Sequence, residues 1–145
     1  MIGDLIRRLT EASERPLLPT DGRLAYAALM VRLARSDDSY TDRERTRIDR
    51  LLAEHYGLTP AEAARLRGEA ETAEAAAPDT VQFTRLIKQA VPYEDRTGVV
   101  EALWRVATAD GIDADERAFL RLVANLLGVS DQDSGLARQR AEERD

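Results

Sequence analysis

Apolar residues recur along most of the chain at the spacing of an α-helix. Two segments, 21–36 and 94–109, are apolar almost all the way round, which predicts helices that are buried on most sides. Two others, 42–56 and 114–127, carry one apolar stripe on an otherwise charged surface, which predicts a single buried face. Weaker helical patterns cover residues 2–13, 60–77 and 80–90.

Proline, glycine and capping residues separate these segments. Pro19 interrupts the chain before the second helix, because proline restricts the residue before it and cannot continue a helix. Thr59 and Glu62 have the spacing of a capping box. Gly57 and Gly128 each follow a striped segment and are predicted to end it. Since β-branched residues do not alternate over any useful length, we expect an all-α fold.

The chain is predicted to form one domain, a helical bundle of about six to seven helices. We expect an N-terminal helix and linker over residues 1–20 and the helical domain over 21–129. The segment 130–145 has Leu136 as its only large apolar residue. Because it can bury little, we expect a mobile tail or a frayed helix there.

The two halves of the sequence resemble each other. Each has an apolar helix, a short acidic connector, a striped helix and a glycine. The copies begin at Leu33 (LARSDDSYTDRERTRIDRLLAEHYGLT) and at Val106 (VATADGIDADERAFLRLVANLLGVS), and they align with two one-residue gaps. The matched pairs are Ala34 with Ala107, Asp37 with Asp110, Thr41 with Asp113, Glu44 with Glu116, Arg45 with Arg117, and Gly57 with Gly128. This pattern predicts an internal duplication with pseudo-twofold symmetry.

Composition excludes several kinds of chemistry. The chain has no cysteine and one histidine, which removes disulfides, zinc ribbons, iron–sulfur ligation and thiol nucleophiles. The 27 acidic residues against 21 basic ones give a net charge of −6, so binding to nucleic acid or anionic lipid is not the expected main role. No apolar run reaches the ~18 residues of a membrane span, and the N-terminus does not resemble a signal peptide. We therefore expect a cytoplasmic protein.

The acidic connectors carry a family resemblance. The pattern A-x-[SA]-D-[DG] followed by [TD]-x-x-E-R occurs twice, with GLTPAEAARL and FTRLIKQ between the copies and ALWRVATADGIDADE at the second. These motifs resemble the tellurite-resistance TerB-like family over roughly residues 24–129. The resemblance implies an all-helical bundle and a divalent-metal site built from acidic residues of the two connectors. It also implies a stress-response or protein-interaction role without an established catalytic activity.

Helix capping explains part of the connector chemistry. Asp113 has the position of an N-cap and Glu116 the third helical position after it, which together make a capping box. Thr41 and Glu44 repeat this arrangement in the first copy. On this interpretation these four side chains serve only to begin two helices.

Asp37 and Asp110 fit capping less well. Each lies at the C-terminal end of an apolar helix, where the helix dipole disfavours an anion. One explanation is that each aspartate accepts hydrogen bonds from the amides that follow it and so forms the turn. The other is a bound cation, and oxygen ligands favour Ca²⁺, Mg²⁺ or Mn²⁺. The candidate metal ligands are Asp37, Glu44, Asp110, Asp113 and Glu116.

No motif in the sequence identifies a catalytic or cofactor-binding residue. His55 is interpreted as a surface or boundary residue and Trp104 as a core residue. The leading hypothesis is a non-enzymatic module that binds an unidentified protein partner and has a divalent-cation site. The alternatives are a metal-dependent hydrolase that uses the same carboxylates, or a structural oligomer in which the acids only cap helices. The oligomeric state stays open.

Overall fold

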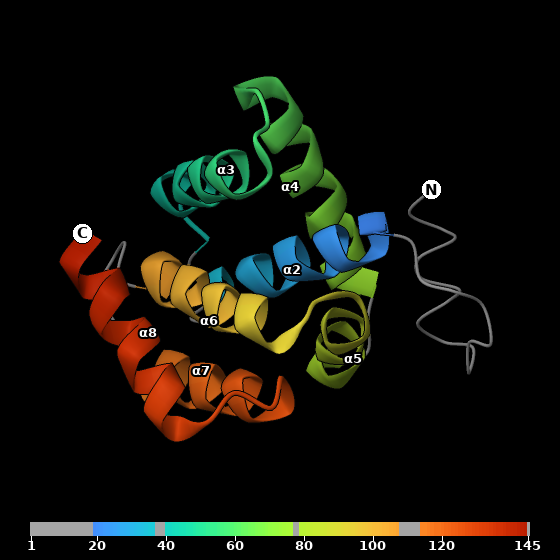
Figure 1. Cartoon of the computed structure of the whole chain (residues 1–145). Coiled ribbons are helices and arrows are strands. Elements are labelled where there is room, and N and C mark those ends of the chain that lie inside the picture. The colour runs from blue at the N-terminus through green and yellow to red at the C-terminus, as the bar shows by residue number, and fades with distance from the viewer. Residues whose placement is uncertain (1–18, 37–39, 77–78, 108–113, 145) are drawn as a thin grey trace.

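The computed structural model describes residues 19–36, 40–76, 79–107 and 114–144. Within these ranges the chain forms helices and no strand, which confirms the predicted all-α fold (Figure 1). The predicted helix over 2–13 lies outside the described residues, and the internal duplication stays a prediction. The helices are α2 (Pro19–Ala34), α3 (Asp42–Tyr56), α4 (Pro60–Ala76), α5 (Thr80–Ala90), α6 (Tyr93–Ala107), α7 (Ala114–Leu126) and α8 (Asp131–Arg144).

Helix α2 forms the centre of the domain. It packs against α4, α5 and α6, with α3 and α4 on one side of it and α7 and α8 on the other (Figure 1). Its side chains from Leu24 to Val31 are all buried, as the nearly continuous apolar pattern predicted. The second apolar helix, α6, buries Val99, Val100, Leu103 and Val106. The two apolar helices are therefore the core, and the striped helices cover them.

The one charged residue in the second half of α2 has a structural partner. Arg32 donates from Nε to Glu74 Oε2 over 3.2 Å and from Nη2 to the Glu74 carbonyl over 3.1 Å. The guanidinium group also lies over the Phe83 ring, 5.2 Å from its centroid. Arg32 thus joins α2 to the end of α4 and the start of α5 without leaving a buried charge unpaired.

The predicted helix ends are largely confirmed. Gly57 and Gly128 have φ of 65° and 74°, the left-handed conformation that glycine adopts without strain. Thr59 and Glu62 form the capping box, with Thr59 N donating to Glu62 Oε1 over 2.9 Å and Glu62 N donating to Thr59 Oγ1 over 3.2 Å. Helix α2 begins at Pro19 and not at residue 21, because proline is tolerated in the first turn, where the missing N–H has no helical partner.

The C-terminal segment differs from the expected mobile or frayed tail. Residues 131–144 form a regular helix, α8, that packs along α6. Ala137 and Ala141 are fully buried, and Arg140 Nε lies 2.6 Å from Glu101 Oε1 in α6. Tyr93 at the start of α6 donates its hydroxyl to Asp133 Oδ2 over 2.7 Å. The small alanine side chains permit this close packing of α8 on α6. The number of large apolar residues in the segment therefore gave too low an expectation of its burial.

Candidate functional site

Two of the five predicted metal ligands lie in the described part of the chain. Glu44 and Glu116 occupy the first turns of α3 and α7, and their exposed fractions are only 4% and 5%. Asp37, Asp110 and Asp113 lie outside the described residues, so their positions relative to the two glutamates are not tested. The structure shows buried carboxylates at matching positions of the two striped helices.

Glu44 begins α3 through a complete capping box. Thr41 has an extended backbone (φ −82°, ψ 160°), and its Oγ1 accepts a hydrogen bond from Glu44 N over 3.1 Å. In return, Glu44 Oε1 accepts from Thr41 N over 2.9 Å and from Thr41 Oγ1 over 3.2 Å. The predicted capping role of this pair is confirmed. One carboxylate oxygen of Glu44 is therefore already occupied by the cap.

The described residues do not by themselves make a metal site. Among them, no group of three or more histidine, aspartate or glutamate side chains is placed to hold a metal ion. A divalent cation with oxygen ligands takes six or more of them, some from water. The predicted cation site therefore needs ligands from outside the described residues in addition to Glu44 and Glu116.

A polar network that the sequence analysis missed follows the first connector. Tyr40 donates a hydrogen bond from its hydroxyl to Glu71 Oε2 over 2.7 Å. Burial, and then this contact with an anion, raise the pKa of the tyrosine. Arg67 bridges Glu71 and Asp49, with contacts of 3.0 Å from Nη1 and 2.6 Å from Nε. Arg45 lies over the Tyr40 ring at 4.3 Å. The charged groups of this network are paired with one another, which indicates that the network stabilises the packing of α3 on α4.

His55 lies beside a small pocket between α2, α3 and α6. Its ring stacks on Tyr26 with centroids 5.1 Å apart, and burial lowers its pKa. The pocket has a volume of about 220 Å³. Its two carboxylates are in ion pairs: Glu54 with Arg105 at 3.2 Å and Glu101 with Arg140 at 2.6 Å. The pocket is lined by Tyr26, Leu51, Glu54, His55, Gly98, Glu101, Ala102 and Arg105.

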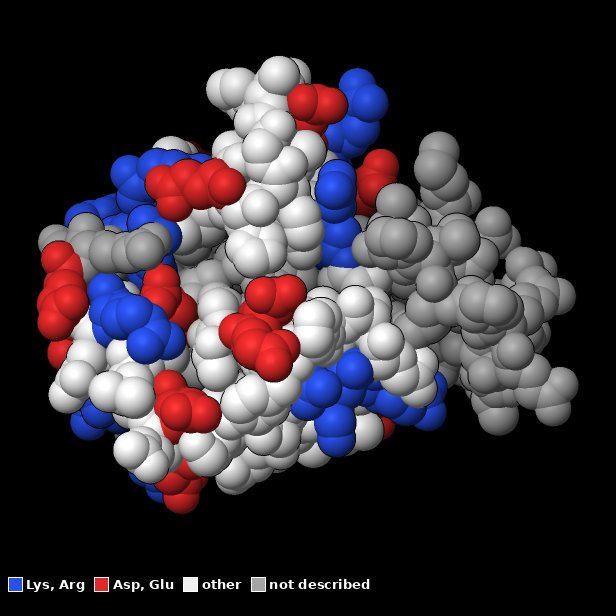
Figure 2. Space-filling model, viewed as in Figure 1, with Lys and Arg blue, Asp and Glu red and all other residues white. Residues whose placement is uncertain are grey.

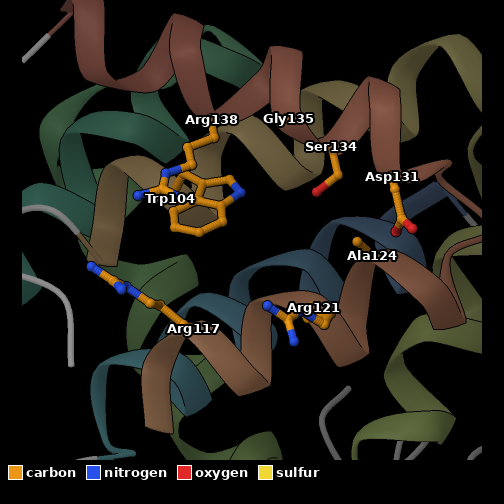
Figure 3. A pocket seen from close by; sticks show the side chains of 8 residues that line it. All are labelled: Trp104, Arg117, Arg121, Ala124, Asp131, Ser134, Gly135 and Arg138. Carbon is orange, nitrogen blue, oxygen red and sulfur yellow. The ribbon is translucent and has the colours of Figure 1, made fainter. Parts of the chain in front are cut away.

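A larger cleft of about 510 Å³ opens between α6, α7 and α8 (Figure 3). Trp104 of α6 forms part of the wall of the cleft. Three arginines also line the cleft, two from α7 and one from α8. Trp104 is only 8% exposed, which confirms the prediction that it is a buried residue. The lining residues are Trp104, Arg117, Arg121, Ala124, Asp131, Ser134, Gly135 and Arg138.

The sequence carried one usable signal for this cleft. Arg117 and Arg121 are four residues apart and so lie on one face of α7, where two like charges repel. Arg138 comes from the segment that was expected to be mobile, so the third side of the cleft could not be anticipated. The cleft exists because α8 packs as an ordered helix.

The fold defines a small all-helical domain with buried glutamates at two helix starts and an open basic cleft. None of the helices in the described ranges is long and apolar enough to cross a membrane. The family model for the tellurite resistance protein TerB matches residues 23–139, and the chain belongs to this family. The match extends from α2 into α8, beyond the predicted domain limit at residue 129. Comparisons with curated proteins and with solved structures found no match.

Proposed function

We propose that this chain is a non-enzymatic TerB module that acts by binding a protein partner, and that a divalent cation held by its acidic connectors stabilises the binding-competent form. The observation that carries the proposal is the burial of Glu44 and Glu116 at equivalent positions of α3 and α7. A buried carboxylate is unfavourable unless it is hydrogen-bonded or paired with a positive charge. The two glutamates thus place negative charge at the points where both connectors enter the helices.

The charge of the connectors supports a cation. Residues 110–117 contain four acidic side chains and a single arginine. A hard divalent cation bound there would supply positive charge and oxygen coordination. The chain's own part is to fix the carboxylates: Glu44 is held by Thr41, and both glutamates are enclosed by the helix packing. The predicted ligands remain Asp37, Glu44, Asp110, Asp113 and Glu116, and Ca²⁺, Mg²⁺ and Mn²⁺ are the candidate ions.

The surface charge supports a protein partner over a nucleic acid. On the face shown in Figure 2, acidic and basic side chains are interspersed, and no extended basic stripe covers it. A nucleic-acid interface usually shows such a stripe, and the net charge of −6 opposes binding to a polyanion. The carboxylates of the small pocket support binding over catalysis, because both are already held by arginines.

Thermal unfolding of the full chain tests the cation. After treatment with a chelator, we expect the Tm to rise when Ca²⁺, Mg²⁺ or Mn²⁺ is added, since a ligand of the folded state stabilises it by about 2.7 kcal/mol at a hundredfold excess over Kd. The double variant Asp110→Asn with Glu116→Gln should lose this shift. The matched control, Glu94→Gln with Asp95→Asn, removes the same charges from an exposed turn of α6 and should keep it.

Two results contradict the proposal. Either no cation changes the Tm of the wild-type chain, or the connector variant responds as strongly as the control. Circular dichroism of the variants in the absence of metal separates a lost site from a lost fold. If all cations fail while the helical content is intact, the buried glutamates serve as caps alone.

A further inference from the structure

The cleft between α6, α7 and α8 concentrates positive charge on a chain that is acidic overall. Three of its eight lining residues are arginines, against the single acid Asp131. Arg117 and Arg121 come from α7, and Arg138 comes from α8 on the opposite side of the opening, where it lies over the Trp104 ring (Figure 3). The volume of about 510 Å³ lies within the range of ligand sites in proteins.

The two arginines of α7 are exposed and lie on the same side of the helix. Within the described part of the chain, neither Arg117 nor Arg121 forms an ion pair or a side-chain hydrogen bond. Arg45, which occupies the place of Arg117 in the first copy of the repeat, has a partner: its Nη1 lies 2.8 Å from Asp42 Oδ1. Among the described residues, the guanidinium groups of Arg117 and Arg121 thus have hydrogen-bond donors to offer an external anion.

The wall of the cleft carries an unsatisfied hydrogen-bond donor. Trp104 Nε1 is buried and has no hydrogen-bond partner in the described part of the structure. The indole nitrogen is on the side of the ring that faces Ser134, whose hydroxyl points back towards it (Figure 3). Arg138 lies over the ring, 4.9 Å from its centroid, and pairs with Glu142 at 3.0 Å on an exposed helix surface. The indole N–H is therefore a donor in the wall of the cleft with no acceptor among the described residues.

We propose that this cleft binds a short acidic segment of a partner protein, with carboxylates on Arg117 and Arg121 and one acceptor on the Trp104 N–H. Guanidinium groups bind carboxylates through two parallel hydrogen bonds, which makes arginine well suited to this partner. Neither of the candidate cation ligands among the described residues lines this cleft, so the proposal and its test do not require a cation. It names the surface and the chemistry through which the module would recognise its partner.

Two features favour a peptide over a phosphate group or a nucleotide. The arginines are spread along a cleft that is larger than a single phosphate, and an extended chain can reach all of them. Asp131 lies at one end, where its carboxylate can accept hydrogen bonds from peptide N–H groups, which a phosphate group does not offer. Stacking of a nucleobase is also disfavoured, because Trp104 is 8% exposed and Arg138 covers its ring.

The chain reports on this cleft directly, because Trp104 is its only tryptophan. The experiment titrates an acetylated, amidated hexaglutamate peptide and follows both the tryptophan fluorescence and the indole ¹H–¹⁵N cross-peak. We expect a saturable change in both signals. Arg117→Gln with Arg121→Gln should weaken binding at least tenfold. The matched control, Arg50→Gln with Arg65→Gln, removes two exposed arginines from α3 and α4 and should leave the affinity unchanged.

Other outcomes would overturn the proposal. An indole cross-peak that does not move with hexaglutamate excludes the site, as does equal binding by the α7 variant and the control. Tighter binding of inorganic phosphate or of a single-stranded oligonucleotide at the same cross-peak would reassign the cleft to phosphate chemistry. Because Arg117 and Arg121 are exposed, the α7 variant should keep the wild-type Tm, which separates lost binding from lost folding.

Discussion

Gly22 of α2 lies directly against Ala90 at the end of α5. A β-carbon added at Gly22 would be only 2.9 Å from the Ala90 β-carbon, closer than non-bonded carbons approach. The absence of a side chain at Gly22 thus lets α2 and α5 approach closely near the start of α2.

Gly22→Ala should destabilise the protein by about 1–3 kcal/mol, because the two helices must separate to admit the methyl group. Urea denaturation measures this change. The double variant Gly22→Ala with Ala90→Gly should recover part of the loss, since it removes the opposing β-carbon. Its coupling energy distinguishes a steric clash from a general effect on the helix.

Gly68→Ala is the control for helix propensity. Gly68 is in the middle of α4 with nothing within 4 Å of an added β-carbon, so alanine should stabilise it by about 0.5–1 kcal/mol. If Gly22→Ala were also stabilising, α2 and α5 could not approach as closely as the structure shows.

The fold was predictable where local chemistry decides it. The apolar patterns identified both core helices, and Thr59, Glu62 and Gly57 marked helix ends because capping and left-handed turns demand particular residues. Pro19 was misjudged because the same residue interrupts a helix or begins one, depending on its neighbours. The packing of α8 was missed because the burial of alanine depends on the partner surface, which the local sequence does not contain.

The candidate sites were predictable only in part. Glu44 and Glu116 are buried in the first turns of α3 and α7, while the internal duplication and the connector aspartates stay predictions. The basic cleft could not be inferred, since Trp104 and Arg138 are far apart in sequence and meet only through packing of α8 on α6. Sites that form between elements require the tertiary contacts to be known.

His55 should make the stability of the protein depend on pH. Its ring contacts Tyr26 and Tyr56, and this partial burial lowers its pKa from the usual 6.5, while Asp95 opposes the shift and Arg23 adds to it. In the window between the folded and unfolded pKa values, the unfolded chain binds a proton that the folded chain does not. The free energy of unfolding should therefore rise with pH through this window and level off above about pH 7.5.

His55→Gln removes this titrating group and provides the comparison. Both proteins lose stability at acid pH through their carboxylates, so the informative quantity is the difference between them. Between about pH 7.5 and pH 5.5, the wild type should lose more stability than the variant in urea titrations. Parallel curves would mean that His55 titrates alike in the folded and unfolded chains.

Arg67 should be a stabilising residue of the α3–α4 pair. It contacts Asp49 at 2.6 Å and Glu71 at 3.0 Å, and its side chain is only 19% exposed. Arg67→Gln leaves two carboxylates without their shared cation, so we expect a loss of about 1–3 kcal/mol by urea denaturation. Arg65→Gln, an exposed change on the same helix, should stay within about 0.5 kcal/mol of the wild type. An equal loss of stability at both positions would show that the ion pairs of Arg67 with Asp49 and Glu71 do not stabilise the fold.

The packing of α8 on α6 gives a sharp test at Ala141. This residue is fully buried, so Ala141→Glu forces a charged side chain into a contact built for a methyl group. We expect α8 to separate locally or the domain to lose about 3 kcal/mol, because a buried unpaired charge is strongly unfavourable.

Gln139→Glu introduces the same charge two residues earlier, on the exposed side of α8, and should behave as the wild type. Trp104 distinguishes the two cases, since its ring lies beneath Arg138 and is shielded by the same helix. Separation of α8 should shift the tryptophan emission to longer wavelength in Ala141→Glu alone. If the segment were instead mobile, neither glutamate would alter the emission or the free energy of unfolding, and the third side of the basic cleft would be absent.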